Sequence, residues 1–397
     1  MSDNMKVSYD FLPVEIVTNI LLRLPVKSVL TCICVCKTWK SIIQNSTFVS
    51  THPNLSIKSN NNLILCRLCS DILDDKEVYV LHNDEDDDLT EHTRLGFPLH
   101  GPDFRPSKKD LDIFRVVGTC NGLICLYDLY DYLTKCIEQL FLWNPCVRKF
   151  VKLPLPNFTF LGRNAAIRTN SYIGLGFDSK TSDYKVVRLL CYVCHPDIPE
   201  DQPVVEVYSL STGEWRMVTV SPPRCTLELD SPPQTFVNGA LHWLAFRRTD
   251  DHKLHRFVLV FNVVDEVFHE IELPEIPTFP CGRSSFISVY GNSIAYFDTK
   301  FLLNGFRQKI WVMKEYGVVS SWTKVLTILH QVSGYAIGFR RNGEVLLKAL
   351  KCRYASLDLE NEKTKDLTIS SNGFILVGSY VESLVLLDID ANRAVTY

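Results

Sequence analysis

Cysteine pairs are the residues of this sequence whose spacing comes nearest to a metal site. Cys66/Cys69 and Cys191/Cys194 each form a C-x-x-C pair, a spacing with which thiolates hold zinc. Both pairs fall in runs that are typical of strands, LILCRLC and VVRLLCYVC. In a strand, positions i and i+3 point to opposite faces. We therefore predict buried or surface thiols and no metal site, because zinc would need both pairs, or added histidines, to converge on one point.

No set of residues has the pattern of a catalytic site. The run Gly174-Leu175-Gly176 lacks the third glycine of a dinucleotide-binding loop, and we expect a turn there. The sequence has neither a G-x-S-x-G elbow nor an H-E-x-x-H helix. His242 and His269 lie in strand contexts, where a packed or surface histidine is commoner than a general base. The sequence therefore predicts a protein that is not an enzyme and needs no cofactor.

The composition is that of an ordinary globular protein. Of the 397 residues, 46% are hydrophobic and 22% are charged, and the formal net charge is -3. The chain thus lacks the basic balance that nucleic-acid binding needs, so we expect no nucleic-acid partner. No stretch approaches the roughly 18 apolar residues of a membrane span, and the first residues, MSDNMKVSYDF, have no apolar run typical of a secretory signal. We expect free thiols and a cytoplasmic or nuclear location.

The elements that could carry a binding function begin with a short helical module over residues 9–50. Pro13 suits the first turn of a helix, and Pro25 ends that helix. Between them an apolar stripe recurs at helical spacing, formed by Ile16, Val17, Ile20, Leu21 and Leu24. Two more short helices are expected after Pro25. A unit of about 40 residues cannot bury so many large apolar side chains by itself, so part of that surface should meet a partner or the rest of the chain.

The helical module resembles an F-box. The matching residues are Leu12-Pro13, Glu15-Ile16, Ile20-Leu21, the run from Arg23 to Ser28, Val35-Cys36-Lys37, Trp39 and Phe48. F-boxes bind the Skp-type adaptor of SCF ubiquitin ligases and through it a cullin, so the resemblance implies these two partners. The positions that it implies to face the adaptor are Leu12, Pro13, Ile16, Ile20, Leu21, Leu24, Pro25, Val26, Leu30, Val35 and Trp39. The alternative is that these residues form only the core of a small helical subdomain.

Residues 116–397 contain short β-rich segments that recur between turn signals. Five similar units carry expected turn glycines at intervals of 52 to 63 residues, namely Gly122, Gly176, Gly239, Gly291 and Gly343. A period of about 50 residues with four strands per unit is typical of kelch-type propeller blades. The strands at 63–81 and the segment 373–388 have no unit of their own, and we expect them to close the ring as one composite blade. The predicted fold class is α+β multidomain, with an N-terminal three-helix F-box followed by an all-β kelch-like propeller of about six blades.

Two further features allow more than one interpretation. Residues 51–115 are expected to hold a linker, the first strand pair and an irregular insertion, whose acidic run from Asp84 to Asp88 we interpret as a solvated loop. Tryptophans recur once or twice per unit, either as packing between blades, which we favour, or as a ring that stacks a ligand as in some sugar-binding propellers. These tryptophans are Trp143, Trp215, Trp243, Trp311 and Trp322.

The order of motifs over nearly the whole chain resembles that of plant F-box proteins with an F-box-associated domain. After the F-box come C-N-G-L-I-C, L-W-N-P, G-F-D-x-x-x-x-D-Y-K-V-V, V-E-V-Y-S-L-x-x-x-x-W and N-G-x-x-H-W. The run from Ser379 to Leu387 resembles the S-locus F-box branch, in which a pistil ribonuclease is one target. The resemblance implies a non-catalytic substrate-recognition subunit of an SCF-type ubiquitin ligase, whose propeller binds a target protein for ubiquitination.

A second function class has to be weighed beside this one. The alternative is a propeller enzyme or a lectin-like binder whose N-terminal helices only cap the ring. The first 48 residues distinguish the two classes, since an enzyme has no need for an exposed apolar helical module. For the target protein we expect binding by loops on one propeller face or by residues 84–110, because loops on a rigid scaffold carry variable recognition.

Overall fold

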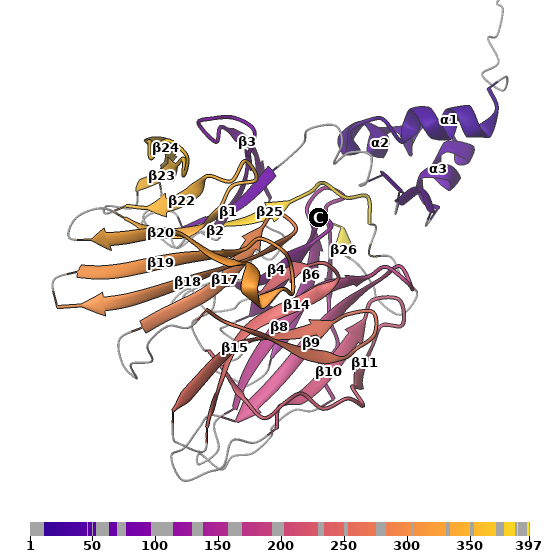
Figure 1. Ribbon diagram of the computed structural model, residues 1–397. Coiled ribbons are helices and arrows are strands. Elements are labelled where there is room, and N and C mark those ends of the chain that lie inside the picture. The colour runs from indigo at the N-terminus through magenta and orange to yellow at the C-terminus, as the bar shows by residue number, and fades with distance from the viewer. Residues whose placement is uncertain are drawn as a thin grey trace, which may run out of the picture.

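The computed structural model shows a small helical module beside a ring of β-sheets (Figure 1). The residues that it describes are 12–45, 47–49, 51–52, 63–69, 77–96, 114–128, 138–157, 169–192, 202–228, 234–249, 253–274, 283–303, 305–330, 334–349, 353–370, 377–385, 387 and 395–396.

Three short helices make up the module, as the sequence predicts. They are α1 (Val14–Leu21), α2 (Val26–Cys32) and α3 (Lys37–Ile43). Pro13 and Pro25 stand at the N-caps of α1 and α2, where the missing amide hydrogen leaves no helical hydrogen bond unmade. Sγ of Cys36 accepts a hydrogen bond from the Trp39 amide and so caps α3 (3.4 Å). Two prolines and one capping cysteine therefore set where each helix begins.

Six antiparallel sheets follow, and we number these blades in chain order. Blade 1 has the strand order β25 (Val377–Tyr380), β1 (Leu63–Cys69), β2 (Glu77–Asn83) and β3 (Glu91–Leu95). Blade 2 runs β4 (Phe114–Cys120), β5 (Leu123–Asp128), β6 (Gln139–Asn144), β7 (Lys149–Lys152) and β26 (Val395–Thr396). Blade 3 runs β8 (Thr169–Asp178), β9 (Asp183–Tyr192), β10 (Val204–Ser209) and β11 (Glu214–Met217).

The remaining three blades complete the ring. In blade 4, β12 (Thr226–Leu227) and β13 (Thr235–Val237) both pair with β14 (Ala240–Arg248), followed by β15 (Leu254–Asn262) and β16 (Phe268–Glu272). Blade 5 runs β17 (Arg283–Tyr290), β18 (Ser293–Leu302), β19 (Gly305–Met313) and β20 (Trp322–His330), with a 3-10 turn (Val319–Ser321) before β20. Blade 6 runs β21 (Tyr335–Phe339), β22 (Val345–Lys348), β23 (Arg353–Leu357) and β24 (Thr364–Ser370). The prediction of a propeller with about six blades is confirmed.

Each pair of neighbouring blades encloses its own apolar cluster. Successive side chains of a strand point to opposite faces, so a blade that is apolar on both faces can pack against two neighbours. Trp143 of blade 2, for example, packs against Tyr79 of blade 1 at a ring-centroid distance of 5.3 Å. Tyr296 of blade 5 lies in one cluster with Val260 of blade 4. The hydrophobic core is therefore divided into sectors around the ring.

Blade 1 joins the two ends of the propeller. Strand β25, from near the C-terminus, pairs antiparallel with β1 and sets Leu63 opposite Tyr380. On the other side of blade 1, Arg340 of blade 6 reaches the turn after β2, where its guanidinium donates to Oδ1 of Asp84 (3.1 Å) and to the Asp84 carbonyl (2.7 Å). The first and last parts of the sequence are thus held together by backbone pairing and by a buried ion pair.

The acidic run and its surroundings differ from the sequence-based expectation. Asp84 is only 7% exposed and is held by Arg340, whereas Asp86 is exposed as expected. The strand β3, which follows this turn, lies within the stretch that we expected to be irregular. The cause lies about 250 residues away, since an arginine in blade 6 gives the loop a partner that no local pattern reveals.

The expected turn glycines are right in four of five cases. Gly122, Gly239, Gly291 and Gly343 all have positive φ in turns between strands. The fifth, Gly176, lies instead within β8, opposite Lys185 of β9. A Cβ at Gly176 would lie 2.8 Å from Cγ2 of Val263, so this glycine permits the close packing of blades 3 and 4. The expectation of a turn at 174–176 was wrong for this reason.

Candidate partner-binding surface

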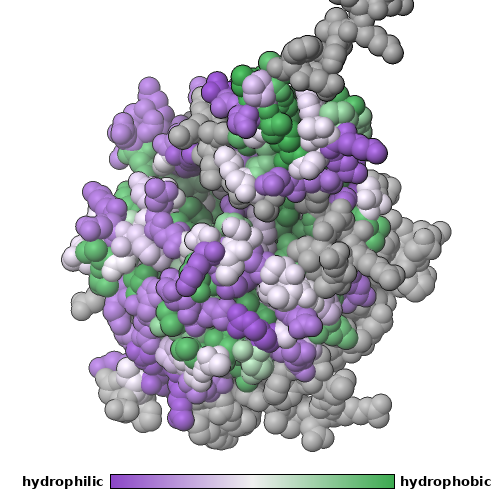
Figure 2. Space-filling model, turned by 90° about the vertical axis from the view of Figure 1, so that its right-hand side faces the viewer, coloured by the Kyte–Doolittle hydropathy of each residue, from purple (hydrophilic) through white to green (hydrophobic). Residues whose placement is uncertain are grey.

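Helix α1 and the residue Leu12 before it present apolar side chains to solvent along the whole length of the helix. Leu12 is 54% exposed, Ile16 47%, Ile20 49% and, after α2, Val35 61%. Figure 2 shows hydrophobic residues gathered over the helical module, at the top of the face that it draws. Exposure of these side chains to water is unfavourable in proportion to their apolar area. These side chains form an exposed apolar surface, which makes this part of the module a candidate for partner binding.

The structure separates the eleven positions that the F-box resemblance implies into three groups. Six are exposed, namely Leu12, Pro13, Ile16, Ile20, Pro25 and Val35. Three are half-buried at the edge of the module core, namely Leu24, Leu30 and Trp39. Leu21 and Val26 are each 1% exposed and lie inside the core, so in this conformation a partner cannot touch them. Val14, 53% exposed, extends the apolar surface at a position that the motif leaves unspecified.

The core of the module is completed by a residue from the C-terminal part of the chain. Leu21, Val26, Val29 and Ile43 form one buried cluster, and Leu384, 1% exposed, belongs to the same cluster. The module is too small to close its own core. It therefore packs against the propeller on one side while its opposite surface remains exposed.

Two polar groups mark the contact between module and propeller. His52, fully buried, shares a hydrogen bond with the Leu24 carbonyl through Nε2 (2.8 Å). Burial lowers the pKa of His52, and this is opposed by that hydrogen bond and by the negative charge of Glu382. Burial also raises the pKa of the Cys146 thiol to about 11, with Glu382 adding to the shift. Both groups are therefore neutral near pH 7.

The segment 381–385 runs between the module and blade 2, and we call it the C-terminal strap. The side-chain amide of Asn144 donates to the carbonyls of Ser383 (3.2 Å) and Val385 (2.9 Å). The strap passes so close to the β4–β5 turn that a Cβ at Gly122 would lie 2.3 Å from Cβ of Ser383. The hydroxyl of Tyr380, just before the strap, donates to the Gly122 carbonyl (3.2 Å). Sequence reasoning missed this link, because the partners of the strap, Asn144 and Gly122, lie more than 230 residues away in the sequence.

Comparison with known families agrees with this architecture. Residues 10–51 match the F-box domain, and residues 72–387 match the F-box associated beta propeller domain. The chain belongs to the F-box-associated propeller family. An F-box/kelch-repeat protein of Arabidopsis thaliana is 28% identical over 325 residues, which cover 80% of this chain and 79% of that relative. The F-box protein CPR1 of Arabidopsis thaliana is 25% identical over 385 residues, 90% of this chain and 84% of the relative.

Among solved structures, the six-bladed Aleuria aurantia lectin is 12% identical and has a TM-score of 0.39, covering 79% of this chain and 97% of the lectin. The kinship of this F-box protein with the S-locus branch stays a prediction. In the described part of the F-box protein, no helix has the length and apolarity to cross a membrane.

The two histidines weighed as candidate bases differ in exposure, since His242 is buried and His269 lies at the surface. His242 is 2% exposed, and its ring contacts the Tyr316 hydroxyl through Nε2 (2.8 Å) and the Thr235 carbonyl through Nδ1 (3.2 Å). Burial lowers the pKa of His242 to about 4, partly opposed by the Thr235 hydrogen bond. Burial likewise lowers the pKa of His269. His242 is therefore a packed histidine without solvent access, which is poorly placed to act as a general base, and His269 is a surface histidine.

The recurring tryptophans lie within or at the edge of the sectors between blades. The indole of Trp215, on the outermost strand of blade 3, donates to the Pro154 carbonyl of blade 2 (2.8 Å). Trp322, on the outermost strand of blade 5, donates in the same way to the Glu272 carbonyl of blade 4 (2.9 Å). Trp143 and Trp243 are 0% and 5% exposed within inter-blade clusters. The packing interpretation is therefore favoured over a ligand-stacking ring.

The two cysteine pairs are only partly covered by the structure. Cys66 and Cys191 are buried, and burial, with the negative charge of Asp84, raises the pKa of Cys66 to about 12. The side chain of Cys69 and all of Cys194 lie outside the described residues. Within the described ranges, no three His, Cys, Asp or Glu side chains are grouped as a metal ion would require.

Proposed function

We propose that this F-box protein is the substrate-recognition subunit of an SCF-type ubiquitin ligase. The observation that carries the proposal is the exposed apolar surface at Leu12, Ile16 and Ile20 on a module whose other side is fixed to a propeller. The F-box binds a Skp-type adaptor and through it a cullin, and the propeller binds a target protein. The catalytic subunits are other proteins, and this chain contributes proximity by holding the target beside them.

The proposed adaptor contacts follow from exposure. The central contacts are Leu12, Pro13, Ile16, Ile20, Pro25 and Val35, with Leu24, Leu30 and Trp39 at the rim. Leu21 and Val26 support the surface from beneath. Apolar anchors near the centre of an interface carry most of its binding energy, and the rim contributes little.

The proposed domain limits are an F-box over residues 9–50 and a propeller that begins with β1. Strands β1 to β3 lie within the 51–115 segment and belong to blade 1, so this segment is part of the ring as much as a linker. We propose a cytoplasmic or nuclear location, where SCF ligases work. The resemblance of residues 379–387 to the S-locus branch adds a pistil ribonuclease as a candidate target.

The test is co-purification of the full chain with a plant Skp-type adaptor. We expect Ile16→Asp with Ile20→Asp to weaken adaptor binding at least 100-fold, because two charges enter an apolar interface at its centre (about 3 kcal/mol or more). The matched control is Val267→Asp, which alters an exposed apolar residue (40%) of blade 4, outside the module. Undiminished binding by the α1 double variant would contradict the proposal.

A further inference from the structure

Exposed apolar residues concentrate at a second place in the described part of the chain. Besides those of the F-box, a group lies where blade 5 ends and blade 6 begins, made of Phe301 (57% exposed), Leu302 (48%), Leu303 (105%), Leu329 (72%) and Tyr335 (40%). We call these five residues the blade-5 tip. They lie at the β18–β19 hairpin, the end of β20 and the start of β21. Because these five side chains are exposed, they contribute little to the packing between blades.

Strand register brings the tip residues together. Phe301 lies opposite Phe306, and the ring of Phe306 meets that of Tyr335 edge-on at 6.1 Å. Leu302 lies opposite Gly305, and Leu303 is in the turn between them. Directly opposite positions on antiparallel strands share a face and have Cβ atoms about 5 Å apart. The tip is therefore one apolar surface that wraps around the end of the hairpin.

Cations border this surface. Lys300 of β18 lies directly opposite Arg307 of β19, and Arg307 lies opposite Leu329 of β20. Lys309, one step further on the same face, lies opposite Asp298, and that carboxylate is only 3% exposed. Among the described residues in register with the tip, three half-buried cations, Lys300, Arg307 and Lys309, thus lie beside one buried carboxylate, although the whole chain carries a net charge of -3.

We propose that the blade-5 tip is the docking surface for the target protein, and that it takes a segment in which acidic residues flank a bulky apolar side chain. The inference rests on the proposed function as a substrate receptor. The apolar side chain covers Leu303 and Leu329, and the acidic residues face Lys300 and Arg307. Charge complementarity of this kind selects the partner and speeds its association.

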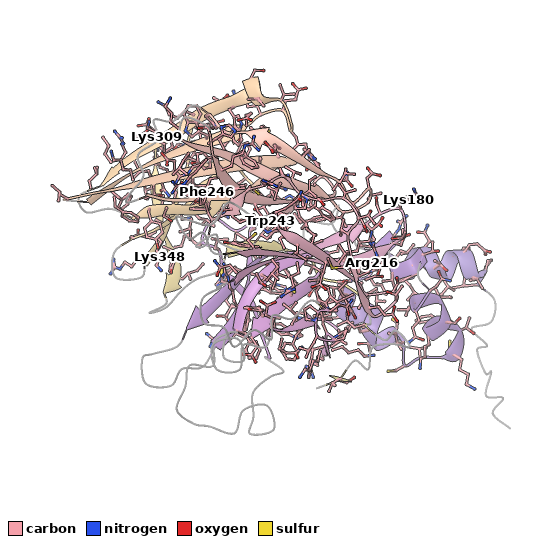
Figure 3. The ribbon with its side chains drawn as sticks, turned by 90° about the horizontal axis from the view of Figure 1, so that it is seen from below. Lys180, Arg216, Trp243, Phe246, Lys309 and Lys348 are labelled. Carbon is pink, nitrogen blue, oxygen red and sulfur yellow. The ribbon has the colours of Figure 1, made fainter. Side chains whose placement is uncertain are left out.

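The position of the tip suits such a role. In Figure 1 the ends of β18 and β20 lie at the left, whereas α1 to α3 lie at the right. Figure 3 likewise places Lys309 on the side of the molecule away from the helices. Target and adaptor would therefore bind at opposite sides of the propeller without competing for surface.

The experiment selects a random 12-residue peptide library, displayed on phage, against the purified full chain. Enriched peptides are then synthesised with a fluorescent label, and their affinity is measured by polarisation. We expect enrichment of Asp and Glu beside Leu, Phe or Ile, and an affinity that falls as salt rises. We expect Leu303→Asp and Arg307→Glu each to weaken binding at least tenfold, while Val267→Asp and Lys180→Glu leave it unchanged.

Arg307→Glu separates binding from folding. It sets opposite charges across β18 and β19, so the thermal stability of the blade should stay equal or rise while binding is lost. Enriched peptides that are basic, that bind all four variants equally, or that do not emerge at all would overturn the proposal. So would wild-type dimers in mass photometry that Leu303→Asp abolishes, because the tip would then serve self-association.

The failure of the proposed function is measured separately. Adaptor co-purification with Arg307→Glu should equal that of wild type, and the α1 variant Ile16→Asp with Ile20→Asp should bind the selected peptides normally. If the wild-type chain did not bind the adaptor, the proposed ligase role would be wrong, while the peptide result would stand.

Discussion

Ile20 and Leu21 are neighbours in α1, yet Ile20 is 49% exposed and Leu21 is 1% exposed. Consecutive residues of a helix point about 100° apart. When one side of a helix packs on a core, an apolar stripe that includes both residues therefore stays partly exposed to water, unless a second protein surface covers it. Leu384 covers one side of that stripe. The motif alone therefore selects the right residues for the module, but it cannot tell which of them support the surface and which form it.

His242 gives a prediction at the residue scale. Its pKa is lowered from 6.5 to about 4 by burial, so the folded state holds the neutral ring while the unfolded state takes up a proton below pH 6.5. The stability that His242 contributes is complete above pH 6.5 and is lost as the pH falls toward 4. Between pH 7.5 and 5 the loss is about 2 kcal/mol.

Urea unfolding at pH 7.5 and pH 5 measures this loss of stability. His242→Gln is expected to be less stable at pH 7.5, because Gln cannot keep both hydrogen bonds, but to show a smaller further loss at pH 5. Equal pH dependence of wild type and variant would contradict a neutral, buried His242.

The elements of this protein were predictable to different degrees. Strands with a period of two and turn dipeptides such as Asn121-Gly122 show the blades locally, so the repeat and the composite closing blade could be inferred from the sequence. Gly176 could not be placed, because a glycine that admits a neighbouring blade looks the same as a glycine in a turn. The C-terminal strap was invisible for a related reason, since its partners Asn144 and Gly122 lie over 230 residues away.

Gly122 provides the prediction at the element scale. Gly122→Ala and Gly239→Ala both force alanine into a positive φ (+80° and +71°), which costs about 1 kcal/mol or more in each case. Only at Gly122 does the new Cβ meet the strap, at 2.4 Å from the Val381 carbonyl oxygen; at Gly239 it meets nothing within 4 Å. We expect Gly122→Ala to lower the unfolding temperature further than Gly239→Ala does.

Hydrogen exchange gives the second readout for this pair of variants. Gly122→Ala is expected to raise exchange in residues 381–385 and in α1 to α3, because a displaced strap withdraws Leu384 from the core of the module. Gly239→Ala should leave exchange in these segments unchanged. Equal effects of the two variants would show that the strap does not hold the F-box in place.

The whole molecule depends on closing a ring from parts that are far apart in sequence. Blade 1 receives β25 from the C-terminal side and Arg340 from blade 6. An open ring would expose the edge of β1 and the apolar cluster between blades 6 and 1, which includes Cys66 and Tyr354. The ring also sets the distance between the proposed adaptor surface and the blade-5 tip, because the F-box is fixed to blade 2 and the strap. Under the proposed function, a fixed geometry between adaptor and target therefore depends on closure of the ring.

Arg340→Ala tests that closure. It leaves the 7% exposed Asp84 without its cation, and breaking a buried pair on one side costs about 3–5 kcal/mol. The matched control is Lys365→Ala, which removes an exposed bridge from blade 6 to Asp88 in the same loop (2.9 Å) and should leave stability unchanged. Because burial raises the pKa of Asp84, the Arg340→Ala variant should recover part of its stability on moving from pH 8 to pH 5, where the carboxyl group takes up a proton more readily. Thermal unfolding of both variants at the two pH values measures these changes in stability. If Arg340→Ala lost as little stability as Lys365→Ala, the pairing of β25 alone would close the ring.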